Sequence, residues 1–177
     1  MTVKIIYMVH GTTQDNIDHL ASGHNNIELA PIGIEQAKKL GTQVTEHFDV
    51  IFTSDLHRSI TTALLAFPGR APIIADPRLR ECDYGELTQK KKEWNIADFI
   101  SKKYPGAESY HDVEIRIREF LDDLKEEFEG KVVAIVAHQG PQLALEVIAN
   151  KKTWEEAIKE DWRNTKSWKP AWIYEIK

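Results

Sequence analysis

The sequence has one cysteine, Cys82, which excludes an internal disulfide and a cysteine-based zinc site. It has no apolar run near the roughly 20 residues that span a bilayer, and its first apolar run is too short for a secretory signal core. It also lacks an excess of positive charge: 23 Lys and Arg against 28 Asp and Glu give a net charge of -5, which argues against general affinity for nucleic acid. We therefore expect a cytoplasmic protein with no membrane or nucleic-acid partner.

The 177 residues contain 42% hydrophobic residues, enough for the core of one domain over 1–177, and we find no repeat or linker. Apolar, β-branched runs predict strands, and apolar positions at helical spacing predict helices between them. Strands are expected at 3–9, 50–52 and 131–137, with a weaker one at 71–75 and an edge strand at 171–176. Helices are expected at 34–48 (with Pro31 in the first turn), 56–67, 113–128 and 143–148. This alternation predicts an α/β fold of three layers, α/β/α, around a mostly parallel sheet.

Two segments have no clear place in that pattern. Residues 86–110 read as an insertion or lid, and their Lys90-Lys91-Lys92 run is expected to be a solvated face, with a cationic rim that attracts anionic substrates as the alternative. Trp154, Trp162, Trp168 and Trp172 crowd the end of the sequence. For these aromatic residues, core packing or a subunit contact is favoured over a wall of a substrate pocket.

Polar side chains follow three of the expected strands. His10 follows the first, Arg58 lies soon after the second, and His138 follows the run at 131–137. Because ligands bind beyond the carboxyl ends of parallel strands, these groups should lie on one edge of the sheet. A neutral imidazole is a good nucleophile toward phosphorus, and a protonated imidazole and a guanidinium can stabilise phosphoryl oxygens. Glu81, in a loop, is the candidate acid for the leaving group.

Six motifs in this order resemble the histidine phosphatase superfamily, in its phosphoglycerate-mutase-like branch. They are Val9-His10-Gly11-Thr12-Thr13, followed by Asn16, and the segments "LAPIGIEQAKKLG", "FTSDLHRSITTA", "LRECDYGEL", "PGAES" and "VAHQGPQLAL". The resemblance spans about residues 3–150 and implies that family's α/β fold.

The resemblance also implies roles. His10 would be the phosphorylated nucleophile, and Glu81 would protonate the leaving group and then act as base for water. Arg58 and His138 would bind phosphoryl oxygens, with further substrate contacts from Gly11, Asn16 and Gln139. It implies a small phosphorylated substrate and neither a metal nor an organic cofactor. It leaves a homo-oligomer open.

The sequence departs from the family pattern in three places. Val9 stands where the family has an arginine directly before the nucleophile, and Gln139 stands where glycine is usual. In addition, the arginine that the family has later in the His138 motif is absent, with Ala144 and Leu145 in that region. Losing one donor to a developing oxyanion can cost about 10²- to 10³-fold in rate. Three outcomes stay open: another cation (Arg80, His24 or His57) fills the space, turnover is slow, or the site binds anions without turnover. Replacing Val9 by arginine should raise phosphate affinity and turnover unless another group already occupies that space.

The sequence thus predicts a phosphomonoester hydrolase of reduced activity that works through a phosphohistidine. The alternative is an inactive module that binds phosphate or a phosphoprotein on the same fold. A mutase is less favoured, because the short chain leaves little beyond residues 86–110 to build a closed lid. His10, Asp15, Asp18, His19 and His24 crowd one region, but their spacing matches no zinc pattern.

Overall fold

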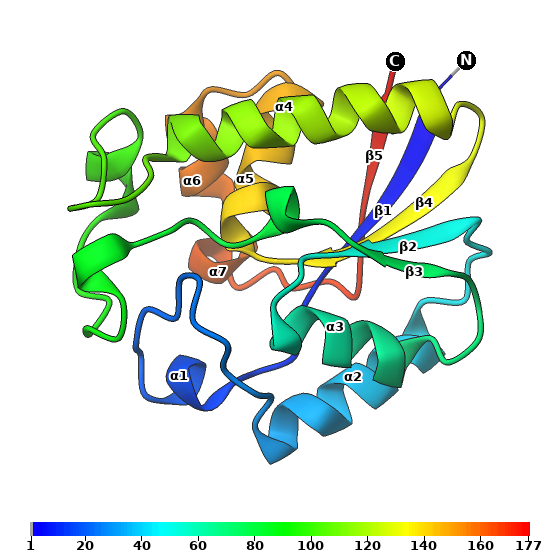
Figure 1. Ribbon diagram of the computed structural model, residues 1–177, viewed down its shortest axis with the longest axis horizontal. Coiled ribbons are helices and arrows are strands. Elements are labelled where there is room, and N and C mark those ends of the chain that lie inside the picture. The colour runs from blue at the N-terminus through cyan, green and yellow to red at the C-terminus, as the bar shows by residue number, and fades with distance from the viewer. Residues whose placement is uncertain (1) are drawn as a thin grey trace.

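The computed structural model describes residues 2–177, which form a five-stranded sheet with strand order β3-β2-β4-β1-β5 (Figure 1). Neighbouring strands pair in parallel, except that β5 runs antiparallel to β1 at the edge. The strands are β1 (Val3–Val9), β2 (Val50–Thr53), β3 (Ile73–Ala75), β4 (Val132–Ala137) and β5 (Trp172–Ile176). The mostly parallel sheet and the expected edge strand at the end of the sequence are confirmed.

The helices cover both faces of this sheet. Helices α2 and α3 lie on one face, and α4, α5 and α6 lie on the other (Figure 1). The helices are α1 (Gln14–Ile17), α2 (Pro31–Gln43), α3 (His57–Ala66), α4 (Tyr110–Glu127), α5 (Gln139–Ile148), α6 (Trp154–Glu160) and α7 (Trp162–Thr165), with short 3₁₀ turns η1 (Pro77–Leu79), η2 (Gly85–Leu87) and η3 (Ile96–Phe99). The predicted three-layer α/β/α architecture is therefore confirmed.

The core explains why the central strands are apolar throughout. In β1, Ile5 and Tyr7 belong to the buried cluster beneath α4 and α5, while Ile6 and Met8 belong to the cluster beneath α2 and α3. Successive side chains of a strand point to opposite faces, so a strand covered on both sides buries neighbouring residues alike, and only Lys4 and Val9 of β1 are partly exposed. The same two-sided burial holds for β4.

Two predicted helices have different ends in the structure. Helix α2 stops at Gln43, and Val44 and Phe48 enter the core from the following loop. Helix α5 starts at Gln139 instead of Leu143. Pro141 falls in its first turn, where the missing N–H has no intrahelical partner to lose, so proline does not delay the helix.

The segment 86–110, predicted to be an insertion, loops out beside the sheet's carboxyl edge (Figure 1). Several of its apolar side chains pack against the core cluster beneath α4 and α5, and Phe99 stacks on Tyr104 with ring centroids 3.9 Å apart. Among residues 2–177, no helix combines the length and the apolar character that crossing a membrane requires.

Candidate active site

A cavity of about 340 Å³ lies at the carboxyl ends of β1 and β4. Six residues singled out from the sequence line it, together with residues that the sequence did not indicate. The predicted ones are His10, Asn16, Arg58, Glu81, His138 and Gln139; Val9 lines it too, and so do Tyr84, Lys92, Trp162 and Arg163. The imidazole rings of His10 and His138 have centroids 5.0 Å apart, so groups separated by 128 positions meet in this one cavity.

The His10 ring is oriented by its own neighbour. Its Nδ1 lies 2.7 Å from the carbonyl oxygen of Gly11. A carbonyl only accepts, so Nδ1 carries the proton and Nε2 keeps a lone pair. Burial, reinforced by the charge of Arg58, lowers the pKa of His10 to about 3. His10 is therefore a neutral imidazole with a free Nε2 at physiological pH, which is the state a nucleophile requires.

His138 is buried, and hydrogen bonds from both its backbone and its ring fix its position. The Tyr7 hydroxyl donates to its carbonyl oxygen at 2.6 Å and accepts from its backbone N–H at 3.0 Å. Its Nε2 lies 2.7 Å from the hydroxyl oxygen of Ser54, and its buried Nδ1 has no hydrogen-bond partner within residues 2–177. Burial and the charge of Arg58 hold the pKa of His138 well below its usual value. The imidazole is thus neutral without ligand, and an entering anion would favour its protonated form.

Arg58, near the start of α3, is only 1% exposed. Its Nη1 and Nη2 donate to the backbone carbonyl oxygens of Asn25 and Gly23, at 2.8 Å each. These bonds fix the guanidinium against the loop that follows α1, with donor capacity left, since a guanidinium carries five N–H groups. Arg58 is therefore a rigid cation at the base of the cavity.

The Glu81 carboxylate lies at the beginning of α5. Its Oε1 accepts from the backbone N–H groups of Cys82 and Gly140, at 2.8 Å each, and its Oε2 accepts from that of Gln139 at 3.2 Å. These three N–H groups fix the orientation of the Glu81 carboxyl group beside the start of α5. The approach depends on glycine at position 140, because a Cβ there would lie 2.6 Å from Oε1.

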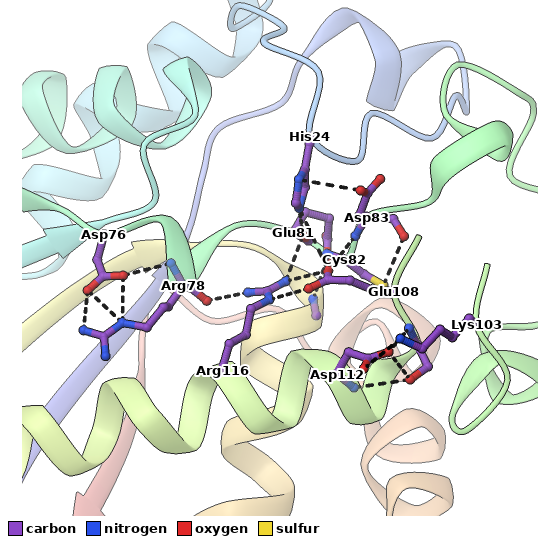
Figure 2. Close-up of polar contacts among 12 residues, drawn as sticks. His24, Asp76, Arg78, Glu81, Cys82, Asp83, Lys103, Glu108, Asp112 and Arg116 are labelled. Atoms are coloured by element: carbon purple, nitrogen blue, oxygen red, sulfur yellow. Dashed lines mark hydrogen bonds and ion pairs between the residues drawn. The ribbon is translucent and has the colours of Figure 1, made fainter. Parts of the chain in front are cut away.

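The loop that carries Glu81 is tied to α4 and to the loop after α1 (Figure 2). Arg116 donates to the Glu81 carbonyl oxygen at 3.0 Å and also to that of Arg78, and His24 Nε2 lies 2.9 Å from the same Glu81 oxygen. Glu108 accepts from Arg116 Nε at 2.9 Å and from the Asp83 backbone N–H at 2.9 Å. These contacts fix the backbone of Glu81. Its side chain is oriented by the backbone N–H groups at the start of α5.

Two residues predicted to contact the substrate make hydrogen bonds within the protein. The Gly11 N–H donates to the Thr62 hydroxyl at 3.0 Å, and Gly11 lines a neighbouring cavity of about 450 Å³. Asn16 Oδ1 accepts from the Thr13 N–H at 2.9 Å, capping α1, which leaves its NH₂ group for the cavity that it lines.

None of the three cations named as replacements at position 9 lines the 340 Å³ cavity. Arg80 forms two 2.6 Å hydrogen bonds to Asp55, and His57 lies 2.7 Å from Glu28. His24 instead contacts the backbone of Glu81.

The cavity draws its further cations from segments that the sequence analysis treated as peripheral. Lys90 and Lys91 are exposed, as expected, but Lys92 turns inward and lines the cavity. Arg163 lines it from α7, beside Trp162, so one tryptophan does form a pocket wall. For Lys92 and Trp162, the less favoured alternatives of the sequence analysis, a cationic rim and a pocket wall, describe their place in the structure. Arg163 is a lone residue in a polar stretch and carried no periodic signal. Within residues 2–177, no group of three or more His, Cys, Asp or Glu side chains is arranged to hold a metal ion.

Comparison with known proteins gives one consistent result. A family model described as "Histidine phosphatase superfamily (branch 1)" matches residues 5–171. A 2,3-bisphosphoglycerate-dependent phosphoglycerate mutase from Rhizobium meliloti (strain 1021) is 28% identical over 179 residues, covering 90% of this chain and 85% of the relative. Phosphoserine phosphatase 1 from Hydrogenobacter thermophilus (strain DSM 6534 / IAM 12695 / TK-6) is 29% identical over 157 residues, covering 81% of this chain and 74% of the relative.

The solved structures agree in fold. The crystal structure of the alpha-ribazole phosphatase from Shigella flexneri superimposes with a TM-score of 0.78 at 28% identity, covering 89% of this chain and 83% of that one. The family match spans nearly the whole chain, including each strand end that supplies a group to the cavity. The chain belongs to the histidine phosphatase superfamily, branch 1.

Proposed function

We propose that this protein is a phosphomonoester hydrolase that acts through a phosphohistidine at His10 on a small phosphorylated substrate. The observation that carries the proposal is the neutral His10, with Nε2 unengaged, 5.0 Å from the ring of His138 in a cavity that also holds Arg58 and Glu81. Both phosphatases and mutases occur among the relatives. Hydrolysis is favoured because the segment 86–110 contributes Lys92 alone to the lining of the cavity, which is little cover against water.

In the first half-reaction, the Nε2 lone pair of His10 forms the N–P bond while the P–O bond to the leaving group breaks. Protonated Glu81 gives its proton to the departing oxygen. In the second half-reaction, ionised Glu81 takes a proton from water, the water oxygen bonds to phosphorus, and the N–P bond breaks. Inorganic phosphate leaves, and both side chains return to their starting states.

The surrounding groups stabilise charge on the transferring phosphoryl oxygens. Arg58 offers its remaining N–H groups, and the unpartnered Nδ1 of His138 becomes a donor when the Ser54 hydroxyl donates to Nε2. Asn16 and Gln139 supply polar contacts at the cavity wall. Val9 supplies no donor, so we expect turnover below that of a site with a guanidinium at this position.

The test is hydrolysis of p-nitrophenyl phosphate by wild type and His10→Ala, with His47→Ala as the control, because His47 is exposed and outside the cavity. Turnover should vanish in His10→Ala and persist in His47→Ala. An acid-labile, alkali-stable phosphoryl adduct should accumulate on wild type and His47→Ala but not on His10→Ala.

The same experiment distinguishes the alternative function. Binding of orthovanadate by wild type, with equal background hydrolysis in wild type and His10→Ala, would replace the hydrolase by a phosphate-binding module. The absence of both binding and His10-dependent hydrolysis would remove the phosphate site altogether.

A further inference from the structure

Two cations besides Arg58 line the cavity. Lys92 comes from the 86–110 segment, and Arg163 comes from α7, some 70 positions later. Apart from Glu81, every charged side chain that lines the cavity is a cation. The two cations therefore line the same cavity as His10, and they come from two segments that lie far apart along the chain.

Arg163 is held in a defined orientation, unlike a mobile surface arginine. Its Nη1 donates to Asp161 Oδ1 at 2.9 Å and to Gln142 Oε1 at 3.3 Å. Its guanidinium carbon lies 4.2 Å from the ring centroid of Trp162, and that ring stacks on Trp172 of β5 at 5.9 Å. Its Nε and Nη2 have no hydrogen-bond partner among residues 2–177 and are available to a ligand.

Gln139 links the two cations. Its Nε2 donates to Asp161 Oδ2 at 2.6 Å, and its Oε1 accepts from Lys92 Nζ at 3.1 Å. Asp161 is buried, and its other oxygen holds Arg163. A continuous chain of hydrogen bonds thus runs from Arg163 through Asp161 and Gln139 to Lys92. A glycine at position 139 could make neither side-chain bond.

The part of the cavity wall that β1 contributes through Val9 offers no hydrogen-bond donor to an anion. Val9 lines both this cavity and the neighbouring one and has no donor. Trp162 lines the same two cavities, so α7 and the end of β1 border the same two spaces. A guanidinium with free N–H groups on Nε and Nη2, lining the same cavity as Val9, offers phosphate oxygens the donors that Val9 cannot.

We propose that Arg163 and Lys92 are phosphate ligands of this site, and that Gln139 and Asp161 are the positioning residues that hold both cations on the side left open by Val9. The proposal rests on the proposed function for the identity of the anion. It accounts for two of the departures from the family pattern together: the donor absent at position 9 is supplied by α7, and Gln139 holds it there.

The main variant is Arg163→Met, which keeps a long side chain over Trp162 and removes the charge; Arg163→Lys keeps the charge. Two readouts are measured: the dissociation constant of inorganic phosphate by calorimetry, and kcat and KM for p-nitrophenyl phosphate. In Arg163→Met we expect phosphate to bind about 10- to 100-fold more weakly and kcat/KM to fall by ~10²-fold or more. Arg163→Lys should lose less, and Arg118→Ala, an exposed arginine paired with Glu114, should match wild type.

Val9→Arg tests whether the two positions share one space. In the Arg163→Met background it should recover at least about tenfold of the lost phosphate affinity, whereas in wild type it should add no more than about threefold, because the space already holds a guanidinium. Gln139→Met should weaken phosphate binding in the same direction with an unchanged melting temperature.

Phosphate affinity of Arg163→Met within twofold of wild type would overturn the proposal, and so would equal gains from Val9→Arg in both backgrounds. These outcomes are separate from failure of the proposed function, which shows as hydrolysis independent of His10. Phosphate binding by calorimetry tests Arg163 whether or not the site turns over.

Discussion

The Tyr7 hydroxyl connects the buried core of β1 to the second histidine of the site. In the structure this one group donates to the His138 carbonyl oxygen at 2.6 Å and accepts from the His138 N–H at 3.0 Å, fully buried. We examine Tyr7→Phe, which removes the oxygen and leaves the ring.

The cost follows from the partners that remain. The His138 carbonyl oxygen keeps a second donor, the Gln142 N–H at 3.3 Å, so it loses about 1 kcal/mol. The His138 N–H loses its partner at a site closed to water, which costs ~1–3 kcal/mol. We therefore expect Tyr7→Phe to lower the free energy of unfolding by about 2–4 kcal/mol. At about 2–4 °C per kcal/mol for a chain of this size, the melting temperature should fall by ~4–16 °C.

The assay is urea unfolding at pH 7.5, with Tyr174→Phe as the matched control. Tyr174 packs edge-on against Tyr7, and its hydroxyl donates to Glu146, whose carboxylate keeps Lys152 and Asn150 as partners. We expect the control to lose about 1 kcal/mol. Because His138 is positioned through its backbone, kcat/KM should fall ~10- to 10²-fold in Tyr7→Phe. A stability within about 0.5 kcal/mol of wild type would refute the reasoning.

Three further predictions concern protonation and the cavity wall. Because the folded-state pKa values of His10 and His138 lie below those of an unfolded chain, the stability from burying them neutral is complete above about pH 6.5 and is lost as pH falls toward 3. Urea unfolding at pH 7.5 and 4.5 should show a smaller loss in His138→Gln than in wild type; equal losses would contradict this. Glu81→Gln should reduce kcat more for an alkyl phosphate than for p-nitrophenyl phosphate, because a poor leaving group depends more on the acid; equal reductions would argue against Glu81 as proton donor. Arg80→Gln should leave the dissociation constant of inorganic phosphate unchanged, since Arg80 pairs with Asp55 outside the cavity; tenfold weaker binding would show that Arg80 reaches the anion.

Much of the scaffold could be predicted from local pattern. The apolar runs of β1 and β4 predicted buried strands because a strand covered on both faces needs no polar alternation. Helix ends were less predictable. Val44 and Phe48 continue the apolar spacing of α2, although they enter the core from a loop. The periodicity therefore predicted correctly that these residues are buried, but wrongly that they are helical.

The candidate site also has a part that could be predicted from the sequence and a part that could not. His10, Arg58 and His138 follow strands, and parallel strands deliver their carboxyl ends to one edge, so their meeting follows from topology. The His10 ring is oriented by a local contact with the carbonyl oxygen of Gly11. The position of His138 required tertiary contacts, because Tyr7 bonds its backbone and Ser54 lies against its Nε2.

The sequence by itself determined the succession of strands and helices along the chain and the edge of the sheet where the polar groups emerge, and it led to the proposal that His10 is the nucleophile. Only the tertiary structure decided which cations face His10. Arg80, His24 and His57 are turned to other partners, while Lys92 and Arg163 enter the cavity. The reason is physical: the spacing of apolar residues along the chain predicts which face of a single helix or strand is buried. The charges around a cavity depend on which unconnected segments pack side by side.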